Sequence, residues 1–413
     1  MSPYVFALRT AFVTFPFIAL LMTMPYMLYQ YHKYGAMLVY RVIVVYTFWF
    51  YVLCMCFLVS LPLPSFEEAA AIQDNMIRLV PFQFLTDIRH EADIAVAGLN
   101  WETLKAVLKT TTFFEAAANI VMMVPFGIYL HYYFEKSWWK VVFWGFAMSL
   151  FFEVSQITAL FGIYPHPYRY FDVDDLICNT SGAFAGCVIT PLLTFFLPSK
   201  ERLNKISYHK GHRVSFIRRA VGTLVDIGVV TAIVFSVFQV MQNHLEFMTG
   251  IETRYRKAVI MYVIYIGVVL IYFVLIPTLT NGRTPGKVLV NIRLKNSRGR
   301  RIGFLQMFVR HVFLYYVVLP APLYALVSYV MMIRYYTGGF GYAACMWAMI
   351  LFMSILVLYL CNVLVVSLTG SHKTICDRFA GTEYVSTIHE EEYDEDSAGE
   401  AAEDSDENDF YQD

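Results

Sequence analysis

Residues 37–60 read MLVYRVIVVYTFWFYVLCMCFLVS and contain one charged residue, Arg41. A helix needs roughly 20 mostly apolar residues to cross the hydrocarbon core of a bilayer, and this stretch is long enough. Backbone polar groups in lipid have to be satisfied within the segment, so such a run predicts a helix rather than a barrel strand. Eight similar stretches occur, at about residues 5–29, 113–134, 139–162, 174–197, 218–241, 258–279, 307–331 and 341–367.

The composition agrees with an all-α polytopic membrane protein of about nine transmembrane helices. Of the 413 residues, 58% are hydrophobic and 15% are charged, and the mean hydropathy is +0.53. An ordinary soluble domain carries roughly 25% charged residues, so a soluble globular protein is excluded. The chain has 7 Cys and no CxxC pair, so we expect the cysteines to be apolar filler and expect no metal and no cofactor.

The basic residues predict the orientation in the membrane. Residues 389–413 hold 13 of the 32 acidic residues and no Lys or Arg, which leaves 19 acidic against 31 basic residues in the rest of the chain. Basic connections stay in the cytoplasm, and the two most basic ones follow the fifth and seventh stretches. This predicts an N-terminus outside and an acidic tail inside, although Arg254, Arg256 and Lys257 would then lie outside. We attribute the excess of basic residues to the orientation of the protein in the membrane and not to nucleic-acid binding.

The same features predict the domain boundaries. Residues 1–198 form a five-helix membrane domain, residues 199–217 a basic cytoplasmic linker, and residues 218–388 a four-helix membrane domain. Residues 389–413 are a charge run with few apolar residues, so we expect a disordered tail. The two halves share no repeat, so an inverted-repeat transporter is not supported.

Polar residues in the first half converge near one membrane surface. A charge at bilayer depth costs a few kcal/mol at least, so such residues face the bundle interior and need partners. Three pairs are spaced by three or four residues, so each pair shares a helix face. We expect an outward-facing acidic pocket, with an arginine as the counter-charge, formed by Glu115, Asn119, Glu153, Gln156, Arg169, Asp172, Asp174, Asp175 and Asn179.

A purely structural role is the alternative for each of these residues. Asp172 or Asp174 would then cap the fifth helix by accepting hydrogen bonds from its first N–H groups. Asn119 and Asn179 would join neighbouring helices by hydrogen bonds.

Three motifs in the first half resemble those of the VanZ-like family. They are NIVMMVPFG (119–127), the Glu153-x-x-Gln156 pair and RYFDVDDLICNTSG (169–182), and the resemblance covers roughly residues 35–197. Met123 departs from the pattern, because the family usually has an aromatic residue there. The resemblance implies a bacterial cell-membrane protein associated with resistance to glycopeptide antibiotics, chiefly teicoplanin. The resemblance implies this resistance phenotype but no chemical reaction.

The second half resembles the RDD family over residues 214–387. The matching elements are Arg219-x6-Asp226, the G-x-T-x-G-K run GRTPGK at 282–287, and the D-x-x-A-G-T run DRFAGT at 377–382. The resemblance raises the expectation of transport. We expect an inner ion-coupling site with four members, Arg219, Asp226, Arg310 and Asp377. The alternative is an internal ion pair between Arg219 and Asp226 that fixes helix packing.

GRTPGK does not match a phosphate-binding P-loop, because its spacing differs and Val288 follows the lysine. The alternating apolar residues at 288, 290, 292 and 294 predict a glycine turn followed by a short β-ribbon.

Three functional hypotheses follow. The first is a pocket that binds a lipid-linked cell-wall precursor or a lipoglycopeptide of the teicoplanin type. The second is a secondary transporter or ion antiporter that uses the Arg219 and Asp226 pair. The third is a scaffold whose acidic tail recruits a basic cytoplasmic partner. No nucleophile and base occur at a readable spacing, so we expect no enzyme. The expected partners are membrane lipids and no nucleic acid, and the sequence does not indicate the oligomeric state.

Overall fold

The computed structural model describes residues 3–61, 63–67, 77–92, 101–164, 166–167, 169–249, 254–298, 301–336, 338–368 and 373–388. The predicted acidic tail, residues 389–413, lies outside these described residues. Within them, nine helices are long and apolar enough to cross a membrane. Their bounds lie within a few residues of the predicted stretches, which confirms the helical membrane class. They are Tyr4–Tyr34, Val39–Ser60, Thr111–Tyr133, Trp138–Ile157, Val173–Thr194, Phe216–Met241, Val259–Leu279, Phe304–Tyr335 and Gly339–Val366.

Contacts divide the chain into two compact units. Unit 1 comprises residues 1–22 and 38–202, and unit 2 comprises residues 23–37 and 203–413. The long first helix, α1 (Pro3–Tyr34), therefore contributes to both units. The predicted linker contains a helix, α10 (Lys200–Gly211), whose residues Leu203, Ser207, Tyr208 and Gly211 are buried on one face.

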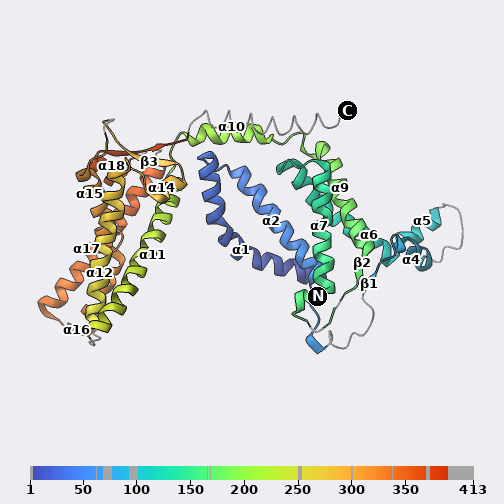
Figure 1. The fold of residues 1–413 in the computed structure, drawn as a ribbon, viewed down its shortest axis with the longest axis horizontal. Coiled ribbons are helices and arrows are strands. Elements are labelled where there is room, and N and C mark those ends of the chain that lie inside the picture. The colour runs from blue at the N-terminus through green and yellow to red at the C-terminus, as the bar shows by residue number, and fades with distance from the viewer. Residues whose placement is uncertain are drawn as a thin grey trace. The chain divides into compact units, whose positions relative to one another are not determined.

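Unit 1 is built around three helices that follow α2 (Val39–Ser60). They are α6 (Thr111–Ile128), continued by the π-helical turn η1 (Tyr129–Tyr133), then α7 (Trp138–Ile157) and α9 (Val173–Thr194). Its core contains Phe48, Met55, Met123, Phe126 and Phe152. The shorter elements are β1 (Ile77–Arg78), α4 (Gln83–Glu91), α5 (Trp101–Val107), α8 (Ala159–Gly162) and β2 (Phe171–Asp172), with β1 and β2 paired in parallel (Figure 1).

Glycines bring α6 and α9 into backbone contact. A Cβ added to Gly182 would lie 2.2 Å from the carbonyl oxygen of Ile120, and one added to Gly186 would lie 2.1 Å from that of Val124. On α6, a Cβ on Gly127 would lie 1.9 Å from the carbonyl oxygen of Ala183. Gly182 and Gly186 form a G-x-x-x-G motif, which lets membrane helices approach closely because it removes side chains from the interface.

Unit 2 packs four membrane helices. They are α11 (Phe216–Thr249), α12 (Arg254–Leu270) with η2 (Ile271–Leu275) and α13 (Ile276–Leu279), α15 (Phe304–Val312) with η3 (Phe313–Val318) and α16 (Ala321–Tyr335), and α17 (Gly339–Leu368). Short elements collect at one end of these helices, away from α16 (Figure 1). They are α14 (Pro285–Leu289), β3 (Ile292–Asn296), α18 (Ile375–Ala380) and β4 (Thr382–Ser386).

The predicted β-ribbon is only partly correct. Residues 285–289 form the helical turn α14, and the strand begins at Ile292. Its antiparallel partner is β4, in the register Ile292 to Ser386 and Asn296 to Thr382. The alternating pattern therefore indicated a strand, but the pattern carries no information on a partner that lies about ninety residues later.

Replacement of Gly186 by Leu is expected to separate α6 from α9, because the new side chain would meet backbone and not a movable side chain. Overpacking of this kind costs about 1–3 kcal/mol. We expect a lower midpoint of thermal unfolding for the detergent-purified protein. Ser181→Leu is the matched control, since Ser181 is exposed on the same helix. An unchanged midpoint for Gly186→Leu would contradict the backbone contact.

Candidate functional site

The predicted polar residues of unit 1 meet at one end of α6, α7 and α9. Asn119 Nδ2 on α6 donates to Asp175 Oδ1 on α9 at 2.6 Å. Glu153 Oε2 on α7 accepts from the N–H of Asp172 at 2.9 Å, just before α9. Asn179 Nδ2 donates to the Ser149 hydroxyl at 3.0 Å. We call Asn119, Ser149, Glu153, Asp172, Asp175 and Asn179 the α6–α7–α9 cluster.

The cluster retains buried hydrogen-bond acceptors. Glu153 and Asn179 are buried, with exposed fractions of 2% and 4%. The carbonyl Oδ1 of Asn179 has no hydrogen-bond partner among the described residues. A buried polar atom without a partner costs about 1–3 kcal/mol, so this position favours an added donor. Glu115 is exposed one turn before Asn119 and interacts electrostatically with Asp175.

Arg169 and Gln156 bind the end of α2. Arg169 Nη1 and Gln156 Nε2 both donate to the carbonyl oxygen of Val59, at 2.8 Å and 3.5 Å. Val59 lies in the last turn of α2, where carbonyl groups lack helical partners and carry partial negative charge. Arg169 also interacts electrostatically with Glu153 and Asp175. It is therefore both a counter-charge of the cluster and a cap of α2.

Asp172 has the capping role that the sequence left open, whereas Asp174 has a different structural role. Asp172 Oδ1 accepts from the N–H of Asp174 at 2.8 Å and caps α9. Asp174 binds the segment that precedes α4, since its carboxylate accepts from the N–H groups of Phe82 and Phe84 at 2.5 and 2.8 Å. Asp174 is 5% exposed, so its carboxylate is already occupied.

A contact that sequence reasoning missed secures the other end of α4. Glu91 accepts hydrogen bonds from the N–H and hydroxyl groups of Thr111 and Thr112, the first residues of α6. The hydroxyl and N–H of Thr111, followed by those of Thr112, lower the pKa of Glu91 to about 2. The available signal was the Thr-rich start of α6, a typical capping sequence. Carboxylates thus hold α4 at both ends.

In unit 2, Asp226 is the centre of a second polar site. Its carboxylate is 1% exposed and accepts from the Tyr272 hydroxyl at 2.8 Å, the Thr284 hydroxyl at 2.5 Å and the Gly286 N–H at 2.7 Å. The ammonium group of Lys287 lies 3.8 Å from Asp226 Oδ2. We call these five residues the Asp226 site.

The G-x-T-x-G-K motif therefore supplies three of the four donors around Asp226. Thr284 gives a hydroxyl, Gly286 an N–H and Lys287 an ammonium group. A Cβ on Gly286 would lie 2.7 Å from Asp226 Oδ1, so glycine is required for this approach. Burial lowers the pKa of Lys287 to about 8, although the Asp226 carboxylate acts in the opposite direction. The structure thus places Lys287 beside Asp226, a contact that the sequence did not indicate.

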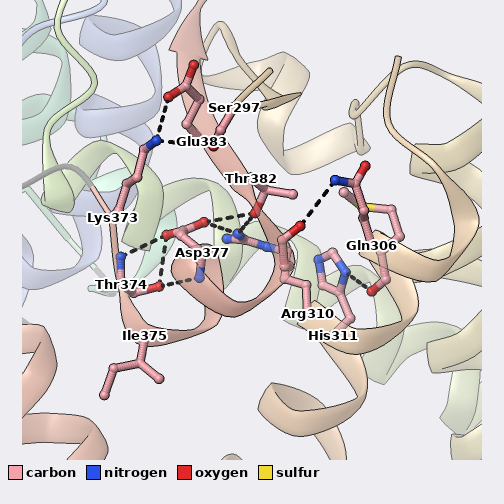
Figure 2. Close-up of polar contacts among 12 residues, drawn as sticks. Ser297, Gln306, Arg310, His311, Lys373, Thr374, Ile375, Asp377, Thr382 and Glu383 are labelled. Atoms are coloured by element: carbon pink, nitrogen blue, oxygen red, sulfur yellow. Dashed lines mark hydrogen bonds and ion pairs between the residues drawn. The ribbon is translucent and has the colours of Figure 1, made fainter. Parts of the chain in front are cut away.

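Arg219 and Arg310 both lie over the ring of Tyr384, with guanidinium carbons 4.9 and 5.0 Å from its centre. Arg310 forms a buried ion pair with Asp377 and donates to the Thr382 hydroxyl at 2.7 Å (Figure 2). Asp377 also accepts from the N–H and hydroxyl of Thr374, so its oxygens are fully used. This pair joins α15, α18 and β4 and is separate from the Asp226 site.

Two π-helical turns line unit 2 beside Asp226. Tyr272 lies in η2 and Tyr315 in η3. The ring of Phe273 stacks on that of Tyr315 with centres 3.8 Å apart. Single π-helical turns inside α-helices are frequent at functional sites, because they expose backbone groups and redirect side chains. No group of His, Cys, Asp or Glu residues within the described ranges is arranged to hold a metal ion.

Comparison with family models agrees with the two resemblances. Residues 48–194 match the model described as VanZ/LLP1, and residues 213–381 match the RDD family model. No curated protein and no solved structure matches the chain. The first match contains the α6–α7–α9 cluster, and the second contains the Asp226 site and the Arg310–Asp377 pair. Both families are membrane families, so the chain is a multi-pass membrane protein.

Replacement of Asp174 by Ala is expected to loosen α4, because two backbone N–H groups lose a charged acceptor. Such bonds are worth about 1.5–3 kcal/mol each. Hydrogen exchange of residues 82–91 should accelerate by roughly 30-fold, which corresponds to about 2 kcal/mol. Asp87→Ala on the same helix is the control, since its carboxylate has no hydrogen bond to a described residue. Equal exchange in the two variants would contradict the role of Asp174.

Proposed function

We propose that this fusion of a VanZ/LLP1 domain with an RDD domain is a bacterial cell-membrane protein that binds a cell-envelope ligand at the α6–α7–α9 cluster. Its role there is binding and not catalysis. The observation that carries the proposal is the convergence of Glu153, Asp175 and the unpartnered Asn179 carbonyl at one end of a helical bundle. All three are hydrogen-bond acceptors, so they favour a ligand with donors or positive charge.

The surroundings of the cluster fit a ligand with both polar and apolar parts. The segment held by Asp174 exposes Leu79, Val80, Phe82 and Leu85, which are 51–64% exposed. Apolar side chains beside an acidic cluster would contact a hydrocarbon chain while the carboxylates bind the polar head. The proposed ligands are a lipid-linked cell-wall precursor and a lipoglycopeptide of the teicoplanin type. Teicoplanin carries a lipophilic tail that vancomycin lacks, so protection should be selective for teicoplanin.

Asp175→Asn and Glu153→Gln are expected to abolish selective protection against teicoplanin in a sensitive bacterial host. Loss of a charged hydrogen-bond acceptor reduces affinity by about 10- to 100-fold. The measurement is the minimal inhibitory concentration of teicoplanin and of vancomycin at matched membrane levels of protein. Glu102→Gln is the control, because Glu102 is exposed on α5 and pairs with Lys105. Full protection by both cluster variants would refute the proposal.

A second candidate function is ion-coupled transport through the RDD domain. The specific observation is the buried Lys287 next to Asp226, since buried carboxylates with a titratable cation are the usual carriers of protons in membranes. Below about pH 8 Lys287 is protonated and the pair is intact. Above that pH the lysine loses its proton and Asp226 loses its cationic partner. Proton release from this pair is the proposed coupling step.

Cation-dependent proton flux in everted vesicles should therefore change near pH 8 and disappear in Asp226→Asn. Lys287→Arg should remove the pH dependence, because arginine stays charged throughout this range. Lys295→Arg is the control, as Lys295 is exposed on β3. Absence of flux in the wild-type protein at every pH would eliminate transport and leave the ligand-binding proposal untouched.

A further inference from the structure

A basic cleft of about 590 Å³ opens on unit 2 beside β4. Its lining includes Arg213, Lys373 and Arg378, together with His212, Glu383 and Tyr384. These residues come from three separate parts of the chain, namely the connection after α10, the start and end of α18, and β4. The cleft lies outside the Asp226 site and has no role in either function proposed above.

The positive charge of the cleft is largely uncompensated. Lys373 is paired with Glu383 at 3.0 Å and donates to the Ser297 hydroxyl at 3.1 Å (Figure 2). Arg213 and Arg378 are exposed, and neither side chain forms a hydrogen bond or ion pair with a described residue. Since the acid in the lining is already paired, both arginines remain available to an anion.

The chain supplies a strongly acidic segment directly beside this cleft. Val385 and Ser386 at the end of β4 are themselves part of the lining. Ile388 is 5% exposed and packs with Tyr34 and Tyr208, so the chain is still held at that residue. The next 25 residues contain 13 Asp and Glu and no Lys or Arg, and the first acids are Glu390, Glu391 and Glu392.

The distances permit these acids to reach the cleft. An extended chain covers at most about 3.3–3.6 Å per residue, so four residues from Ile388 to Glu392 span up to ~13 Å. A tether this short gives an effective concentration of the order of millimolar, which exceeds what a weak electrostatic contact needs. Charge complementarity and covalent attachment therefore both favour the acidic segment of the same chain as the occupant of the cleft.

We propose that the acidic segment, residues 389–413, occupies the basic cleft of its own chain. Its carboxylates pair with Arg213, Arg378 and Lys373. This electrostatic pairing weakens as ionic strength rises.

Zero-length carbodiimide cross-linking of the full chain in uncharged detergent tests the proposal. The reagent joins lysine amines to carboxylates in direct contact, and mass spectrometry identifies the pairs. The link between Lys373 and Glu383 is an internal positive control, because the structure pairs these residues. We expect links from Lys373 to acids of 390–396, with a yield that falls about threefold or more between roughly 50 and 500 mM salt.

Two double variants distinguish an effect of the cleft from an effect of basic charge elsewhere on the protein. Arg213→Gln with Arg378→Gln should lower the links from Lys373 to the segment about threefold or more while the link to Glu383 persists. Lys205→Gln with Lys210→Gln removes the same charge from the exposed face of α10 and should leave the Lys373 links unchanged. Persistence of the Glu383 link also reports that the cleft variant is folded.

Three outcomes would overturn the proposal. One is absence of links between Lys373 and the segment while the Glu383 link forms. Another is a preference of the segment for Lys205 and Lys210, which would place it on α10. The third is equal binding of short-chain phosphatidylglycerol by the full chain and by a chain ending at residue 388. In that case the cleft is an open lipid site, and the segment does not protect it.

Discussion

Among the described residues, each buried carboxylate of these apolar bundles receives hydrogen-bond donors, because a buried polar group without them is costly. Asp226 receives a hydroxyl from η2 and a hydroxyl, an N–H and an ammonium group from the α14 turn. Asp174 receives two N–H groups from the start of α4. These hydrogen bonds hold the connecting segments against the helix ends, because the segments supply the donors that surround the buried acids.

This constraint explains the GRTPGK turn in physical terms. A glycine turn that presents an N–H, a hydroxyl and a lysine is chemically an anion-binding loop. In this chain the turn surrounds the carboxylate of Asp226, so the likeness to a phosphate loop has a chemical basis. The turn then leads into β3, whose pairing with β4 brings Tyr384 beside Arg219 and Arg310. The carboxylate of Asp226 thus holds α14, and the chain continues from α14 into the paired strands β3 and β4.

The two domains use their polar groups differently. In unit 1, Asp172 and Asp174 are occupied by capping and by α4, whereas Glu153, Asp175 and Asn179 keep acceptors that the fold does not saturate. In unit 2, Arg310 and Asp377 are buried and paired with each other, and Lys287, whose pKa is lowered by burial to about 8, lies beside Asp226. Unit 1 therefore leaves acceptors open, whereas unit 2 surrounds its buried carboxylates with donors.

The sequence by itself determined the membrane class, the nine stretches, the order of the two domains and the convergence of Asn119, Glu153, Asp175 and Asn179, because hydrophobic length and helical spacing are local properties. Only the tertiary structure decided the partners. Three contacts join residues far apart in the chain, namely Lys287 with Asp226, β3 with β4, and Glu91 with the start of α6. No periodicity encodes such contacts, since they depend on which helix ends the folded bundle brings together.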